Sequence, residues 1–175
     1  MELLYLERPS NMIVTTLRHN LYSGVDPERV LSSIKDGARV FSAFNSREKV
    51  KKALLRIKEA DEGISIVVSG LIDRVREISE EIGLEPHMVN LSLGVHGNTN
   101  RLPPPDIRQF TTMCGHGVVS PVLVRNVVRK VKTGKVSAWE GSLILAKPCA
   151  CGIFNPHRSE EILKEIVPLY TVERR

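Results

Sequence analysis

The chain is poor in aromatic residues and has no long apolar run. Aromatic side chains make up 5% of its 175 residues, so the core must be built mainly from valine, isoleucine and leucine, which suit layered helices and strands. No stretch reaches the roughly 20 apolar residues that a membrane span requires, and residues 1–6 lack the pattern of a secretory signal peptide. We therefore expect a cytoplasmic protein that makes no use of a membrane.

Standard nucleotide-binding motifs and a paired set of cysteines are also missing. Neither GxGxxG nor GxxxxGK[ST] occurs in the sequence, which argues against the usual dinucleotide and nucleoside triphosphate sites. The chain has three cysteines, and an odd number does not suit a closed disulfide framework. Clustered cysteines in a reducing compartment more often serve metal binding or redox chemistry than structural bridges.

The middle of the chain has the pattern of an α/β fold. Three apolar or β-branched runs have strand length, at residues 38–44, 64–68 and 88–93. Helical patterns separate them, with apolar residues at Val50, Ala53 and Leu54 in the first and a start at Ser69 in the second. Strands that alternate with helices indicate parallel pairing through right-handed crossovers. We therefore predict a βαβαβ core in a two-layer or three-layer sheet, with a ferredoxin-like mixed sheet as the alternative.

The last third of the chain is predicted to be mainly helical. Further elements are expected as strands at 12–17 and 107–113, a helix at 25–35, and helices that begin at Ser120, Ser137 and Asn155. Ser120 and Asn155 precede prolines, and Ser137 stands three residues before Glu140; these are signals of helix N-termini. The predicted organisation is an α/β core at 1–100 and a Cys/His-bearing helical region at 101–175, packed on the same domain.

Two short segments carry all the cysteines and give the clearest functional signal. They are Cys114-Gly115-His116-Gly117 and Cys149-Ala150-Cys151-Gly152. Each places two potential metal ligands at positions i and i+2, beside glycines that allow unusual backbone angles. Three cysteines and one histidine are a ligand set that zinc accepts, and three thiolates could also hold an iron–sulfur cluster. We predict a metal site made of Cys114, His116, Cys149 and Cys151.

Two other interpretations of these cysteines remain open. Cys149 and Cys151 could form a thiol-redox pair with Cys114 as a third thiol, or Cys114 could be the nucleophile of a metal-free enzyme with a histidine base. All three cysteines could instead pack inertly in the core, because free cysteine is among the most buried residue types.

Polar residues after the predicted strands complete the expected site. In a parallel sheet the carboxyl ends of the strands meet at one edge, where ligands bind. This would bring Ser69, His96 and Asn98 towards Cys114. We expect His96 and Asn98, with Cys114, to serve catalysis, and the helix start at Ser69 and Gly70 to bind a small anion or cofactor group.

The sequence leaves the partner and the reaction open. An enzyme or redox protein that acts on a small molecule is the first expectation, with zinc or an iron–sulfur cluster as its cofactor. A binding module with structural zinc is the alternative, in which the basic stretch 125–135 contacts nucleic acid or an acidic partner. Aromatic residues are absent from this stretch, so a base-stacking surface is not indicated. A homodimer is a further possibility.

Overall fold

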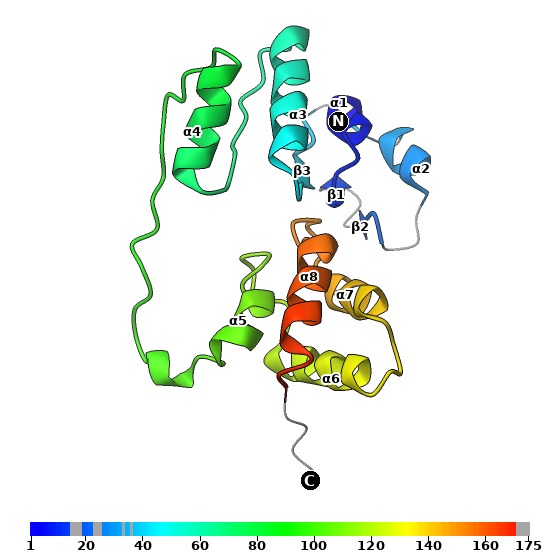
Figure 1. The fold of residues 1–175 in the computed structure, drawn as a ribbon. Coiled ribbons are helices and arrows are strands. Elements are labelled where there is room, and N and C mark those ends of the chain that lie inside the picture. The colour runs from blue at the N-terminus through cyan, green and yellow to red at the C-terminus, as the bar shows by residue number, and fades with distance from the viewer. Residues whose placement is uncertain (15–18, 23–25, 33, 36, 171–175) are drawn as a thin grey trace.

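The protein is mostly helical and carries one small antiparallel sheet (Figure 1). The structure is a computed structural model that describes residues 1–14, 19–22, 26–32, 34–35 and 37–170. In chain order its elements are α1 (Glu2–Leu6), β1 (Asn11–Val14), β2 (His19–Asn20), α2 (Pro27–Ser32), β3 (Val40–Ala43), α3 (Arg47–Ala60), α4 (Ile72–Glu81), η1 (Thr99–Arg101), α5 (Pro105–Thr111), α6 (Pro121–Lys132), α7 (Ala138–Ala146) and α8 (Pro156–Ile166).

The sheet is formed by the first part of the chain. Its strand order is β2-β1-β3, and both pairings are antiparallel. Met12 of the central strand β1 is buried and lies opposite Ser42 of β3. The predicted strands at 12–17 and 38–44 are therefore present in part, as β1 and β3; residues 15–18 lie outside the described residues. The helix predicted at 25–35 corresponds to α2, and part of that range also lies outside them.

The predicted α/β fold class is wrong, because the described residues contain no βαβαβ sheet. Residues 64–68 and 88–93 form no strand and lie in connections on either side of α4. A strand needs a neighbour for its backbone hydrogen bonds, and neither segment has one in the described part of the chain. Both segments were predicted as strands from their apolar residues, and this prediction is wrong because the described residues supply no partner strand for either.

The strand predicted at 107–113 is also wrong, since this segment begins as helix α5. Pro105 occupies the first turn, where its missing N–H costs no hydrogen bond. Ile107 and Phe110 are three residues apart and are both buried. The i, i+3 spacing of the two buried residues is the spacing of one helix face and therefore favours a helix.

The main core lies in the C-terminal helices, which begin where the sequence predicts. Ser120 accepts a hydrogen bond from the Leu123 N–H, and Ser137 and Glu140 form a capping box. The core cluster joins α5, α6, α7 and α8 and contains Ile107, Phe110, Cys114, Val119, Val124, Val127, Val128, Leu145, Ala146, Cys149, Phe154, Ile162 and Leu163. Cys114 and Cys149 thus belong to the best-packed part of the molecule.

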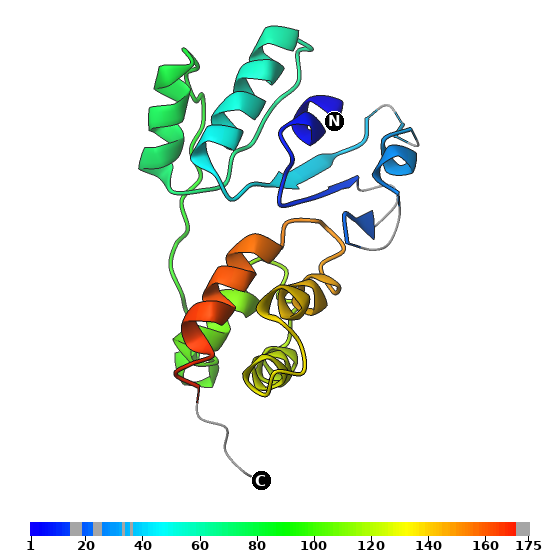
Figure 2. The ribbon, with the colours of Figure 1, turned by 45° about the vertical axis from the view of Figure 1, so that its right-hand side comes forward.

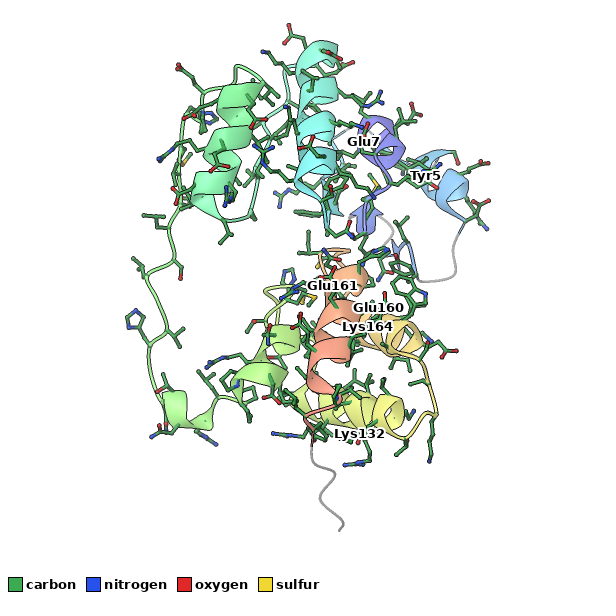
Figure 3. The ribbon with its side chains drawn as sticks, in the orientation of Figure 1. Tyr5, Glu7, Lys132, Glu160, Glu161 and Lys164 are labelled. Atoms are coloured by element: carbon green, nitrogen blue, oxygen red, sulfur yellow. The ribbon has the colours of Figure 1, made fainter. Side chains whose placement is uncertain are left out.

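A second, much smaller core joins α3 and α4. Its buried members are Leu54, Ile78 and Ile82. At the helix ends, Glu81 of α4 pairs with Arg47 and with Lys51 of α3, the latter at 2.8 Å. Near the other face of α3, Glu7 pairs with Arg56 (Figure 3). Three buried side chains and exposed ion pairs make this pair of helices a weakly stabilised unit.

Buried asparagines connect the N-terminal sheet to the C-terminal helices. The Asn11 side chain donates to the Phe154 carbonyl at 2.9 Å, and Asn20 donates to the Cys149 carbonyl at 2.8 Å. In return, the Asn155 side chain donates to the Phe44 carbonyl at 3.3 Å. Figure 2 shows the sheet above the loop between α7 and α8. The sheet therefore holds the loop that carries Cys149 and Cys151.

The outer face of α8 is polar. Lys164 and Glu160 lie one helical turn apart and form an ion pair at 2.7 Å (Figure 3). Across the described ranges, no helix is both long enough and apolar enough to cross a membrane.

Candidate functional site

The loop between α7 and α8, residues 147–155, is the centre of the candidate site; we call it the cysteine loop. The Cys149 N–H donates to the Ala146 carbonyl at 3.0 Å, which continues the turn beyond the end of α7. Gly152 has a φ of 66°, a left-handed angle that a side chain disfavours. Its N–H donates to the Cys149 carbonyl, which reverses the chain. Cys149 and Cys151 are thereby held on the same short turn.

The two sulfur atoms of the cysteine loop are in contact. Cys149 Sγ lies 3.3 Å from Cys151 Sγ. Cys149 is fully buried, whereas Cys151 is half-buried, so only Cys151 offers its sulfur to solvent. The Phe154 N–H points to Cys149 Sγ at 3.3 Å. The pair therefore consists of an inner and an outer thiol with different surroundings.

His116 joins the pair from the other cysteine-bearing segment. Its Nδ1 lies 3.4 Å from Cys151 Sγ. His116 stands between Gly115 and Gly117, whose φ angles of 75° and 66° are left-handed. These two glycines let the chain turn sharply after α5, so that the histidine ring meets the cysteine loop. The structure thus brings His116, Cys149 and Cys151 of the two segments together, and the metal site predicted from them stays a prediction.

The surroundings of Cys149 disfavour its thiolate. Burial raises the pKa of the Cys149 thiol above its ordinary value, and the neighbouring Cys151 raises it further. The Phe154 N–H opposes this shift, because an amide donor stabilises a sulfur anion. These surroundings therefore favour the protonated form of Cys149.

Cys114 lies in the same core cluster but is not part of the sulfur pair. It is 5% exposed and packs among the residues of the main core. Within the described parts of the chain, no group of three or more His, Cys, Asp and Glu side chains has an arrangement that could hold a metal ion. The four predicted ligands have the right chemistry for zinc, but as described they do not surround a common point.

The other predicted site residues lie elsewhere. Ser69 and Gly70 are exposed in the connection before α4, whose N-cap is Leu71 with no side-chain cap. His96 is exposed, and its Nε2 lies 2.7 Å from the carbonyl oxygen of Leu93. Asn98 is exposed just before η1. The parallel sheet that was expected to gather these residues at Cys114 is absent from the described residues, so no common edge brings them together.

Two residues that shape the cysteine loop were not predicted from the sequence. Asn11 and Asn20 are buried and donate hydrogen bonds to two of its backbone carbonyls. An asparagine inside a strand is the available signal, because this residue is depleted in strands. Its distant partner could not be identified without the fold.

The basic stretch 125–135 covers most of α6 and the turn after it. Arg129, Lys130 and Lys132 lie in the last helical turn, where cations are stabilised by the helix dipole. Lys132 donates to the Pro168 carbonyl at 3.2 Å (Figure 3). These contacts give the stretch a structural role, and binding of nucleic acid by it stays a prediction.

Comparison of the chain with protein family models, curated proteins and solved structures finds no match.

Proposed function

We propose that this protein is a thiol–disulfide exchange protein whose working pair is Cys149 and Cys151. The observation that carries the proposal is the 3.3 Å contact between the two sulfurs, with His116 on the outer one. Two thiolates bound tetrahedrally to one zinc ion at about 2.3 Å would stand roughly 3.8 Å apart. Direct sulfur contact therefore favours a pair that closes on itself over a pair that is separated by an ion.

The two cysteines differ in the way that the reaction requires. An attacking thiol must be accessible and able to lose its proton, and a resolving thiol can stay protected until a mixed disulfide has formed. Cys151 is half-buried and touches an imidazole, which can take up its proton. Cys149 is buried, and its pKa is raised. We assign Cys151 as the attacking thiol, Cys149 as the resolving thiol and His116 as the base.

The exchange proceeds in two steps. The Cys151 thiolate attacks one sulfur of a substrate disulfide, whose S–S bond breaks, and the departing thiolate takes up a proton. Cys149 then loses its proton and attacks Cys151 Sγ in the mixed disulfide, which releases the second substrate thiol. The substrate disulfide gains two electrons and two protons, and the protein gains a Cys149–Cys151 disulfide. The substrate class is a small-molecule or protein disulfide.

Mass spectrometry of the full chain tests this assignment. The reduced protein is equilibrated in buffers of increasing glutathione disulfide content, and free thiols are then alkylated and located by peptide mapping. We expect a Cys149–Cys151 disulfide that leaves Cys114 free to react after unfolding. Brief labelling of the native reduced protein should modify Cys151 several times faster than Cys114 and Cys149, since only Cys151 reaches solvent.

Two variants give matched controls. His116→Gln replaces the imidazole ring with a polar amide that cannot act as a base, and it should therefore slow the labelling of Cys151. Cys114→Ser should leave both the disulfide and the labelling rate of Cys151 unchanged. Equal, slow labelling of all three cysteines in the native chain, or oxidation that joins Cys114 instead, would contradict the proposal.

Binding of a soft metal ion is the second candidate function. It is favoured by the meeting of His116, Cys149 and Cys151 from two distant segments, with Cys114 buried in the same cluster. Because the described side chains do not have an arrangement that could hold an ion, binding one would require these donors to rearrange. Elemental analysis of anaerobically purified protein separates the two candidates. Stoichiometric zinc or iron that protects all three cysteines from labelling would favour the metal over the free thiol pair.

A further inference from the structure

Two uncharged stretches of chain flank α4 and are largely exposed, although Val68 of the first packs against the small core of α3 and α4. Residues 63–72 and 86–100 contain no Asp, Glu, Lys or Arg, although 26% of the chain is charged. They lie in the connections that precede and follow α4, and in Figure 1 the second runs down one side of the molecule. Their large apolar side chains are exposed: Ile64, Ile66, Val67, Leu71, Met88, Val89, Leu91, Leu93 and Val95.

The second stretch has the residue pattern of a strand with one apolar side. Val89, Leu91, Leu93 and Val95 alternate with small or polar residues, and their exposed fractions run from 53% to 91%. Successive side chains of an extended chain point to opposite faces, so these four share one face. Among the described strands, none pairs with residues 88–95. The segment therefore has the side chains of a half-buried strand but lacks a neighbour.

Its sequence fits a second copy of itself. If two copies pair antiparallel with Ser92 opposite Ser92, Leu91 of each copy lies opposite Leu93 of the other. Val89 then lies opposite Val95, and Asn90 opposite Gly94. Every cross-strand pair on one face is apolar, and every pair on the other face is small or polar. A two-fold axis through Ser92 produces this register, as the symmetric interface of a dimer requires.

Charge and size also favour a second copy. The chain carries a formal charge of +5, so two copies repel each other except where the facing surfaces are uncharged. The two stretches offer a surface of this kind. Together they contain 25 residues, within the roughly 20–30 residues on each side of a standard interface. Groups of large exposed apolar side chains such as these mark interaction sites.

We propose that the protein forms a homodimer in which residues 89–95 of two copies pair as antiparallel strands about Ser92.

The oligomeric state of the full chain tests the proposal. Light scattering after size-exclusion chromatography should give twice the 19.6 kDa of one chain at high concentration. Leu91→Lys places a charge on the apolar face and should give a monomer with unchanged helix content by circular dichroism. Asn90→Lys, the matched control on the other face, should remain a dimer. A wild-type chain that is monomeric at every concentration, or a Leu91→Lys dimer, overturns the proposal.

A cysteine placed at the centre of the pairing tests the register. Ser92→Cys puts two thiols opposite each other on the two-fold axis, where directly paired Cβ atoms stand roughly 5 Å apart. Mild oxidation should join the two copies through residue 92, and peptide mapping distinguishes this link from the native cysteines. A dimer that forms without this link pairs through a different surface and contradicts the proposed register.

Discussion

The C-terminal helices and the stretches around α4 use similar apolar residues with opposite results. In α6, Val124, Val127 and Val128 are buried, whereas Val89 and Leu91 of the second stretch are more than half exposed. Apolar residues at i, i+3 and i+4 gather on one side of a helix that makes its own backbone hydrogen bonds. Alternating apolar residues depend on a neighbouring strand. The comparison shows that the spacing of apolar residues, more than their number, decides whether a segment can bury itself unaided.

The sharpest test of this contrast replaces one leucine in each region with alanine. Leu163 is fully buried between the C-terminal helices, so Leu163→Ala should lower the free energy of unfolding by about 2–5 kcal/mol. Leu91→Ala should change it by less than about 0.5 kcal/mol in dilute solution, where the monomer prevails. Urea unfolding measures both. Equal losses of unfolding free energy would mean that the second stretch is buried within the monomer and would contradict the contrast between the two regions.

A tight contact between α6 and α7 gives the next largest effect. A Cβ atom on Gly141 would lie 2.9 Å from a methyl group of Val131 and 3.0 Å from one of Val127. Gly141→Ala should therefore destabilise the protein by about 1–3 kcal/mol through overpacking, less the gain of about 1 kcal/mol in helix propensity. In a Val131→Ala background the same substitution should cost less, because the nearer of the two clashing methyl groups is gone while that of Val127 remains. Additive losses by urea unfolding would show that the two helices pack more loosely than described.

The capping box of α7 should contribute less than the core. Ser137→Ala removes the acceptor of the Glu140 N–H and should cost about 1 kcal/mol. Hydrogen bonds from the Ser137 N–H and hydroxyl lower the pKa of Glu140. A depressed pKa gives stability that is present above the ordinary value of 4.5 and is lost as the pH falls through the lower one. The melting temperature should fall less steeply between pH 6 and pH 3 for Ser137→Ala than for wild type.

The smallest effect is expected at the pair of helices α3 and α4. Ion pairing with Arg47 and Lys51 lowers the pKa of Glu81 to about 2. Its contribution should be complete above pH 4.5 and should vanish as the pH falls through about 2. Because Glu81 is exposed, Glu81→Gln should cause only a small loss at neutral pH. A loss as large as that of Leu163→Ala would show that α3 and α4 depend on this pair more than on Leu54 and Ile78.

The sequence was sufficient to place a helix start where the capping signal lies within a few residues. Ser120, Ser137 and Asn155 each begin a helix, because a capping side chain and its N–H partner lie within three residues. It was misleading at 64–68, 88–93 and 107–113, where short apolar runs suit either element and the outcome depends on distant neighbours. At the site, residue types and glycines indicated two converging segments. The sequence did not indicate that Cys114 would stand apart, since its packing in the main core depends on several helices.

The contacts of Asn11 and Asn20 with the cysteine loop have a consequence for folding. Their hydrogen bonds span 143 and 129 residues, so the first strands can acquire these partners only after Cys149 and Phe154 have been synthesised. Contacts of such separation are slow to form, because loop closure must be complete before they contribute. The C-terminal helices, with their local contacts, should therefore assemble first and the sheet should dock last.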